Sequence, residues 1–179
     1  MKFILFLCAA FTVFPTSMFQ VGLKQLSTEA EQIVQATVTS IVVMFNRDST
    51  EIHTYIRMNI KDDLVGAQED NEIIVKQLGG RVGTLTMGVE GTSVYKTGEE
   101  NVLFLFKDPF NNDSYQTLGM YQGRYRVFTG TDNIRRVQRD TTGHATLYKS
   151  LAGTAPAVTG DGMSLDDFKM TVQTLRTGN

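Results

Sequence analysis

The chain has 179 residues, of which 41% are hydrophobic, a formal net charge of -2 and a single cysteine. This length and hydrophobic content suit one folded domain and exclude an intrinsically disordered chain. The near-neutral charge gives no electrostatic basis for binding nucleic acid or an anionic membrane, and one cysteine excludes a disulfide framework.

The first segment has the pattern of an export signal. Lys2 precedes an apolar run, Phe3 to Phe14, which ends at Pro15. The run is shorter than the roughly 20 residues that a membrane-spanning helix needs. We therefore interpret residues 1–22 as a secretory signal peptide, with the cleavage site between Ser17 and Gln25, and predict a secreted or periplasmic protein without a membrane span after signal removal. A buried N-terminal helix or strand is the alternative.

Cys8 lies inside this predicted signal. Leu7 stands where a lipoprotein signal would carry a small residue, so we expect no lipid attachment there. The mature chain would then have no thiol, and with it no disulfide, thiolate metal site or cysteine nucleophile.

The segment after the signal predicts a short helix followed by strands. Ser27 and Thr28 are good N-cap residues, and Thr28 with Glu31 has capping-box spacing. Residues 34–45 predict a strand that begins with apolar alternation, and residues 72–78 predict another. Between them lies the most regular alternation in the chain, with one face formed by Ile52, Thr54, Ile56, Met58 and Ile60.

A glycine-rich stretch, Gln77 to Val94, raises the question of a phosphate-binding loop. Such a loop needs a helix after the glycines and usually a Gly-Lys-Ser/Thr sequence. No such sequence follows here, and residues 84–94 are rich in threonine, valine and glycine, which are poor helix formers. We predict instead turns and bulges around an exposed loop.

The second half of the chain adds strands and a terminal helix. The unbroken apolar run Val102 to Phe106 predicts a strand buried on both faces, and residues 109–114 predict a loop. Gly119 and Gly123 are expected bulge points. Residues 133–140 are strand-like, and their cluster of arginines is interpreted as a solvated strand face; it consists of Arg135, Arg136 and Arg139.

These elements predict a mainly β fold, a small OB-like Greek-key barrel with a short N-terminal helix and a C-terminal helix. A β-sandwich is the alternative. The predicted organisation is a signal peptide (1–22), a β-barrel domain (23–140), a flexible glycine-rich connection (141–163) and a C-terminal amphipathic helix (164–179). Ser164 caps that helix, with Asp167 at its third position.

The residues that carry chemistry do not form a recognisable catalytic or metal site. His53 and His144 are far apart in the sequence and are both interpreted as exposed. No nucleophile motif occurs, and the adjacent pairs Glu99–Glu100 and Asp166–Asp167 are interpreted as surface charge. Aspartates of residues 111–114 and 161–167 could offer oxygen ligands to calcium, but neither stretch has EF-hand spacing. We predict no catalytic residue, no cofactor and no metal.

A binding surface is the remaining candidate. Aromatic and planar polar side chains lie near the glycine bends, and tyrosine and arginine are favoured in protein interfaces. The alternative is that Tyr121 and Tyr125 only pack one side of a strand. The predicted partner-binding residues are Arg81, Glu90, Tyr95, Tyr121, Gln122 and Arg124.

Over Leu26 to Asp140 the chain resembles a group of uncharacterised exported bacterial proteins. The resemblance rests on "LSTEAEQIVQATV", "IHTYIRMNIKDDLVG", "IIVKQLGGRVG", "VEGTSVYKTGEENVLFL" and "GMYQGRYRV", in that order, and "SLDDFKMTVQTLR" looks like their terminal helix. Such proteins are often encoded beside matrixin-type zinc metalloproteases. The segment order is also similar to the netrin-like OB barrel of tissue metalloprotease inhibitors. Those inhibitors chelate the protease zinc through an N-terminal cysteine, which this mature chain would lack, so that mechanism does not carry over.

The functional hypothesis is a secreted, non-enzymatic module that binds a protein partner, and the resemblance suggests an exported metalloprotease. The Gly79–Ser93 segment is the expected contact. Two alternatives stay open: a ligand- or glycan-binding domain of the cell envelope, and an unrecognised hydrolase.

Overall fold

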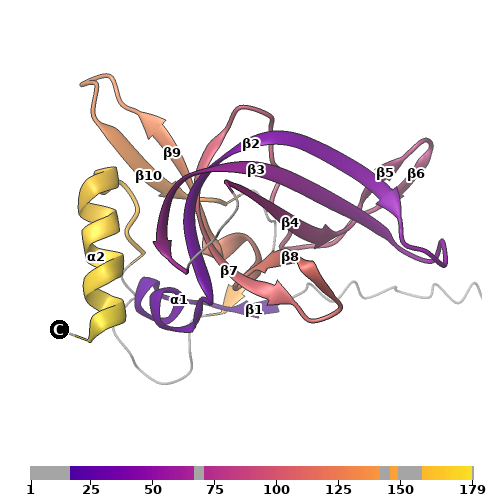
Figure 1. Cartoon of the computed structure of the whole chain (residues 1–179), viewed down its shortest axis with the longest axis horizontal. Helices are drawn as coiled ribbons and strands as arrows, with labels where there is room; N and C mark the ends of the chain where they lie inside the picture. Colours follow the sequence, from indigo (N-terminus) through magenta and orange to yellow (C-terminus); the bar gives the residue numbers. More distant parts are fainter. Residues whose placement is uncertain (1–16, 67–70, 142–145, 149–158, 179) are drawn as a thin grey trace, which may run out of the picture.

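The computed structural model describes residues 17–66, 71–141, 146–148 and 159–178 (Figure 1). The strands are β1 (Ser17–Phe19), β2 (Gln32–Phe45), β3 (Ile52–Val65), β4 (Glu72–Leu78), β5 (Gly80–Val82), β6 (Leu85–Met87), β7 (Glu100–Asp108), β8 (Asn111–Thr117), β9 (Arg124–Thr129), β10 (Arg135–Arg139) and β11 (Thr146–Tyr148). The helices are α1 (Leu23–Glu29), the 3-10 helix η1 (Met120–Gly123) and α2 (Leu165–Thr177).

Five strands close into a ring in the order β2, β3, β4, β8, β7 and back to β2. Every neighbouring pair is antiparallel except β4 and β8, which run parallel and are paired only at Val75 and Tyr115. The sheet continues beyond β7 into β9 and β10. This partly open, five-stranded Greek-key arrangement confirms the predicted OB-like barrel.

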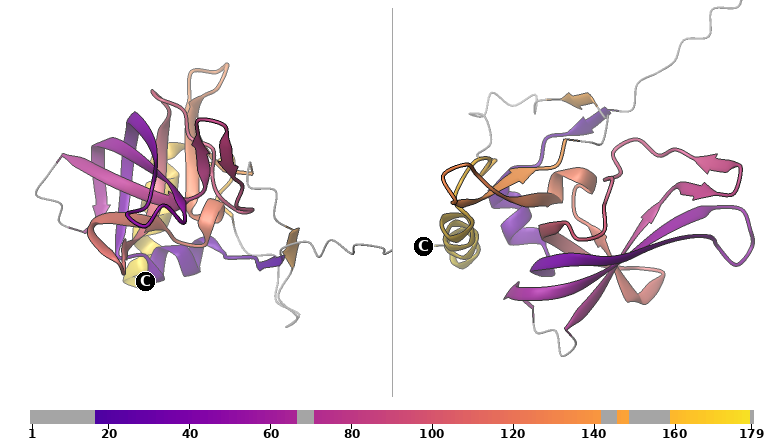
Figure 2. Two further views of the ribbon diagram at one scale, coloured as in Figure 1. Left: turned by 90° about the vertical axis from the view of Figure 1, so that its right-hand side faces the viewer. Right: turned by 90° about the horizontal axis from the view of Figure 1, so that it is seen from above.

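β2 and β3 are the longest strands, and their far ends leave the barrel as a two-stranded ribbon (Figure 2). β2 pairs with β7 only over Gln32–Thr37, so the rest of β2 has β3 as its only paired strand among the described residues. Register shifts between β2 and β3, the last of them between Val38 and Ser40, mark bulges that bend the ribbon. The alternation in the sequence predicts the buried face of β3 correctly, because Ile52, Ile56 and Met58 are all buried.

Strand β7 separates two hydrophobic cores, which confirms that its apolar run is buried on both faces. Val102 and Phe104 face a core between the sheet and the helices, which also contains Leu23, Leu26, Ala30, Ile33, Tyr125, Val137, Leu165, Phe168 and Val172. Leu103 and Leu105 face the interior of the barrel, which also contains Val34, Ala36, Val38, Ile56, Met58, Ile73, Val75 and Tyr95. The side chains of one strand therefore hold the barrel and the helical layer together.

Helix α2 forms where the sequence predicts it. The Ser164 hydroxyl accepts a hydrogen bond from the Asp167 backbone N–H at 3.1 Å and so caps the first turn. Leu165, Phe168 and Val172 are buried in the first core, and Met170 on the same helix is 63% exposed. Arg176 at the other end donates to the carbonyl oxygens of Ser27 and Ala30, which ties α2 to the end of α1.

The predicted start of the first helix is wrong. α1 begins after Gly22 and ends at Glu29, so Ser27 and Thr28 lie inside its last turn rather than at its N-cap. Their hydroxyls instead donate back to the carbonyl oxygens of Leu23 and Lys24, the usual bond of serine and threonine within a helix.

Two further expectations differ from the structure. The predicted loop over residues 109–114 is mostly strand, since β8 starts at Asn111. Instead of forming bulges, Gly119 is the N-cap residue of the 3-10 helix η1 and Gly123 is its last residue. Gly119 adopts a left-handed conformation with φ of 65°, and a Cβ on Gly123 would lie 2.2 Å from the Leu118 carbonyl oxygen.

The folded unit begins before the predicted domain boundary at residue 22. Gln122, which is fully buried, donates to the Phe19 carbonyl oxygen and accepts from the Val21 N–H. Much of the predicted 141–163 connection lies outside the described residues, and so does most of the predicted signal. No helix in the described part of the chain has the length and apolar character to cross a membrane.

Candidate functional site

The six residues predicted to bind a partner do not share one surface. Arg81 and Glu90 are exposed. The other four are buried: Tyr95, Tyr121, Gln122 and Arg124. A buried side chain cannot contact another protein without rearrangement of the fold. These four side chains therefore contribute to the stability of the fold.

Arg124 is the centre of a buried polar cluster. Its guanidinium donates to the carboxylates of Asp140 at 3.1 Å and Glu99 at 2.7 Å. It also donates to Asn101 Oδ1 at 2.8 Å and to the Val94 carbonyl oxygen at 2.7 Å. The Arg124 guanidinium carbon lies 4.0 Å from the centre of the Tyr95 ring, a cation–π contact. Burial raises the pKa of Tyr95, against the opposing charge of Arg124.

Arg139 belongs to a second buried cluster and not to a solvated strand face, so its place in the predicted arginine cluster is wrong. Its guanidinium donates to Tyr125 Oη at 2.9 Å and to the Val21 carbonyl oxygen at 2.9 Å. Tyr125 in turn donates to the Thr159 carbonyl oxygen at 2.6 Å. These bonds join β9, β10, the segment before α1 and the segment before α2.

We expect the free energy of unfolding to fall between about pH 10 and about pH 12 because of Tyr125. Burial raises the pKa of Tyr125 to about 12, against the opposing charge of Arg139. An unfolded tyrosine has a pKa near 10. Below about pH 10 both states are protonated and the stabilisation is complete; as the pH rises, the unfolded chain deprotonates first, which costs the folded state up to about 3 kcal/mol.

Urea unfolding at about pH 8 and about pH 11.5 measures this loss. Burial also raises the pKa of Tyr95 and Tyr121, so the whole chain loses more than Tyr125 alone contributes. In the Tyr125→Phe variant the loss over the same interval should be smaller. An equal loss in both proteins would contradict the assignment to Tyr125.

The glycine-rich stretch forms a small hairpin, β5–β6, and not a phosphate loop. A turn at Gly83, with φ of 59°, leads directly into strand β6. Gly80 packs against the ribbon, where a Cβ would lie 2.5 Å from a Val43 methyl and 2.7 Å from the Thr54 hydroxyl. The glycine therefore lets the hairpin approach the inner face of the ribbon closely.

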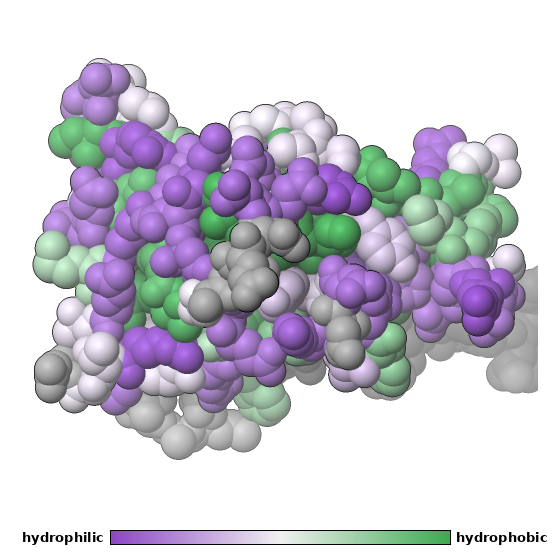
Figure 3. All heavy atoms as spheres, in the orientation of Figure 1, coloured by the Kyte–Doolittle hydropathy of each residue, from purple (hydrophilic) through white to green (hydrophobic). Residues whose placement is uncertain are grey.

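The ribbon and this hairpin form the projecting end of the molecule, which we define as residues 39–58 and 79–93. They project side by side on the side of the barrel away from α2 (Figure 2). Hydrophobic residues gather at this end over β5, β6 and the adjoining strands of the ribbon, whereas the turn at the tip of the ribbon, residues 46–51, is polar (Figure 3). Val42, Met44 and Leu85 are 47%, 46% and 59% exposed.

The outer face of the ribbon carries a groove of about 230 Å³. Its walls combine apolar side chains, an aromatic ring and one guanidinium. Arg57 is paired with Glu72 at 2.9 Å on the half-exposed rim, so the groove carries little net charge. The lining residues are Ser40, Val42, Met44, Tyr55, Arg57 and Ile74.

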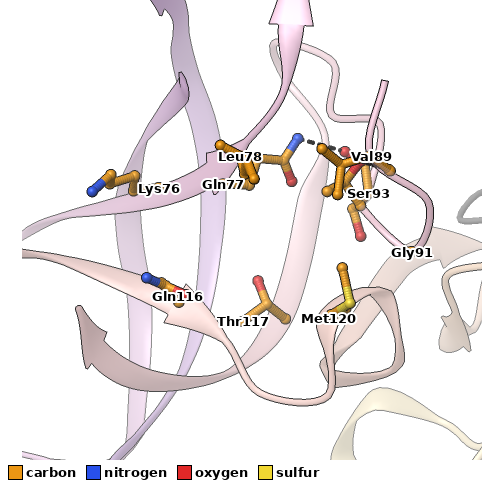
Figure 4. Close-up of a pocket in the computed structure, with 10 residues that line it drawn as sticks. Lys76, Gln77, Leu78, Val89, Gly91, Ser93, Gln116, Thr117 and Met120 are labelled. Atoms are coloured by element: carbon orange, nitrogen blue, oxygen red, sulfur yellow. Dashed lines mark hydrogen bonds between the residues drawn. The ribbon is translucent and has the colours of Figure 1, made fainter. Parts of the chain in front are cut away.

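A second hollow, the cleft, lies where the barrel is open between β4 and β8 (Figure 4). Leu78, Val89 and Met120 give it an apolar lining, and the Thr117 hydroxyl points into the gap from β8. Gln77 Nε2 donates to the Ser93 carbonyl oxygen at 2.9 Å and holds the covering segment over it. The cleft measures about 180 Å³, so it suits one small, mainly apolar group.

The ionisable residues near these hollows are paired in structural contacts. Asp108 is buried and accepts from Lys76 at 2.8 Å. Burial alone would raise the pKa of Asp108, but the bonds from Lys76 and the Phe110 amide lower it below its ordinary value. Glu99 is bound to Arg124 and Glu100 to Arg135, so this pair is not free surface charge.

His53 is buried and not exposed as predicted, and it pairs with Glu51 at 3.0 Å. No group of three or more metal-ligating side chains occurs within the described ranges. His144 lies outside them. Asp167, one of the aspartates with a predicted calcium or surface role, accepts from the Ser164 hydroxyl at 2.6 Å.

No protein-family model matches the chain, and no curated protein is significantly similar to it. The geometry of the projecting end is therefore the main guide to function. The sequence predicts an exposed loop with turns where the structure has the β5–β6 hairpin, and it does not predict the exposure of Val42 and Met44. The signal was present in the run Ile41 to Phe45, five apolar residues in a row on a strand that alternates elsewhere.

Proposed function

We propose that the chain is a secreted, non-enzymatic binding module that contacts a protein partner through its projecting end. The carrying observation is that both elements that leave the barrel expose large apolar side chains: Val42 and Met44 on the outer face of the ribbon, and Leu85 on the hairpin. Apolar side chains gathered on an exposed surface are typical of protein interaction sites. Arg81 and Glu90, the two exposed residues of the predicted set, lie in the same end and would form its polar rim.

The resemblance to exported bacterial proteins, and not the geometry, suggests a matrixin-type zinc metalloprotease as the first partner to test. Inhibition by an N-terminal cysteine would not be the mode of contact, since the only cysteine is Cys8. The alternative function is the binding of a small ligand in the cleft. Ser93 Oγ is buried there and makes no hydrogen bond of ordinary geometry with the described residues, so it could bond to a polar group of such a ligand.

The experiment is a titration of the immobilised chain with a matrixin-type zinc metalloprotease. We expect Leu85→Asp to weaken binding at least tenfold, because the substitution replaces the exposed apolar side chain of the hairpin with a charge. Met170→Asp is the matched control, since Met170 is equally exposed and apolar but lies on α2. No measurable binding by the unaltered chain would overturn the partner class.

A further inference from the structure

Beyond its pairing with β7, the edge of β2 that faces away from β3 is an unprotected strand edge. Beyond Val38, which exchanges backbone hydrogen bonds with Glu99 and Gly98, no backbone group of the described residues pairs with this side of β2 up to Phe45. The segment Ser40–Phe45 contains no charged residue, proline or glycine. Charged residues and prolines are what proteins usually place on free edges to prevent pairing with another strand.

The other outer strand of the sheet shows the contrast. β10 carries Arg135 and Arg136, and its free side is covered by the segment before α2. Val137 exchanges backbone hydrogen bonds with Met163 and Gly162, and Arg136 forms a bridge with Ser164. Only the β2 edge, among the outer edges of this seven-stranded sheet within the described residues, combines apolar sequence with unpaired backbone.

The register shows which groups point outward. The Asn46 N–H donates to the Glu51 carbonyl oxygen, so Asn46 and Glu51 form the first hydrogen-bonded pair of the ribbon. In an antiparallel ladder the bonded and non-bonded pairs alternate, so Met44 and Val42 face β3. The N–H and C=O groups of Ile41, Val43 and Phe45 therefore point to the free side.

We propose that this edge pairs antiparallel with the same edge of a second copy, about a two-fold axis at Val43. This register sets Val43 opposite Val43 and Ile41 opposite Phe45, and it is the one that pairs all three outward residues in both copies. Each such pair exchanges two hydrogen bonds, so about six form across the axis.

Side chains and charge favour a second copy as the occupant. In this register Val42 of each copy lies opposite Met44 of the other, and both are nearly half exposed in one copy. The pairing opposes no like charges because the segment carries none. The same patch is used on both sides, as a closed two-fold dimer requires. The contact is smaller than a standard interface, so we expect association in the micromolar range.

Cysteine crosslinking tests the register in a Cys8→Ser background, which removes the chain's own thiol. Directly opposed residues of a bonded pair lie about 5.5 Å apart between Cα atoms, within disulfide range. We expect Val43→Cys to give a covalent dimer on mild oxidation. Val42→Cys is the matched control, because Val42 faces Met44 and its own counterpart lies about 7 Å away or more. Equal crosslinking of the two variants, or none, would overturn the proposal.

A second measurement does not depend on a new thiol. In sedimentation equilibrium the unaltered chain should dimerise with rising concentration, whereas Met44→Lys should weaken dimerisation at least tenfold. Met170→Lys on α2 should leave it unchanged. A dimer that survives Met44→Lys unaltered, or a chain that stays monomeric at about 100 μM, would contradict pairing at this edge. The inference does not rest on the proposed function, since it holds without any other partner.

Discussion

Replacing Arg124 with methionine should reduce the free energy of unfolding by about 3 to 5 kcal/mol, the range observed when one partner of a buried ion pair is removed. The guanidinium is fully buried and holds Asp140, which is also fully buried, together with the partly buried Glu99. Methionine fills a similar volume but removes the guanidinium that donates to the Asp140 and Glu99 carboxylates. Small domains have about 5 to 15 kcal/mol of stability in total, so the variant would be close to unfolding.

Urea unfolding of three proteins measures this effect. Arg57→Met is the matched control, because Arg57 forms its ion pair with Glu72 at the half-exposed surface and should cost less than about 1 kcal/mol. Arg124→Lys keeps the positive charge but loses the planar set of N–H donors of the guanidinium, so we expect an intermediate loss in the free energy of unfolding. If Arg124→Met were as stable as Arg57→Met, the cluster would not hold the fold.

Replacing Phe168 with alanine should cost about 3 to 5 kcal/mol, because the substitution leaves a cavity in the first core. The Phe168 ring is fully buried, with its centre 4.7 Å from that of Tyr125 and 6.3 Å from that of Phe104. Loss of this ring would weaken the packing of α2 against β7 and β9. The same packing explains Gly160, where a Cβ would lie 2.7 Å from the Phe168 ring.

Met170→Ala is the control on the same helix, and we expect a change within about 0.5 kcal/mol because that side chain is mostly exposed. Thermal and urea unfolding of both variants measure the difference. Similar stability of the two variants would mean that α2 does not dock on the barrel.

The parts of the fold that were predicted correctly are those with a local signal. The alternation over residues 52–61 and the unbroken run in β7 indicate how many faces of each strand are buried. The Ser164 cap depends on residues three positions apart. The first helix was misplaced because serine and threonine bond equally well to a helix N-terminus and to the preceding turn.

The buried polar clusters could not be predicted, because their members come from distant parts of the chain. Arg124 meets Glu99, 25 positions earlier, and Asp140, 16 positions later. Arg139 meets Val21 across 118 positions. Nothing near either arginine in the sequence shows that it is enclosed, so the sequence alone predicts surface positions for both. The projecting end was only partly predicted for the same reason: the ribbon and the β5–β6 hairpin come together through Gly80.

The ratio of the protease affinities of the Leu85→Asp and Met170→Asp variants tests most directly whether the chain acts through its projecting end. With both variants folded, the account predicts that Leu85→Asp binds at least tenfold more weakly. A ratio near one, or a greater loss for Met170→Asp, would place the contact elsewhere and contradict the account.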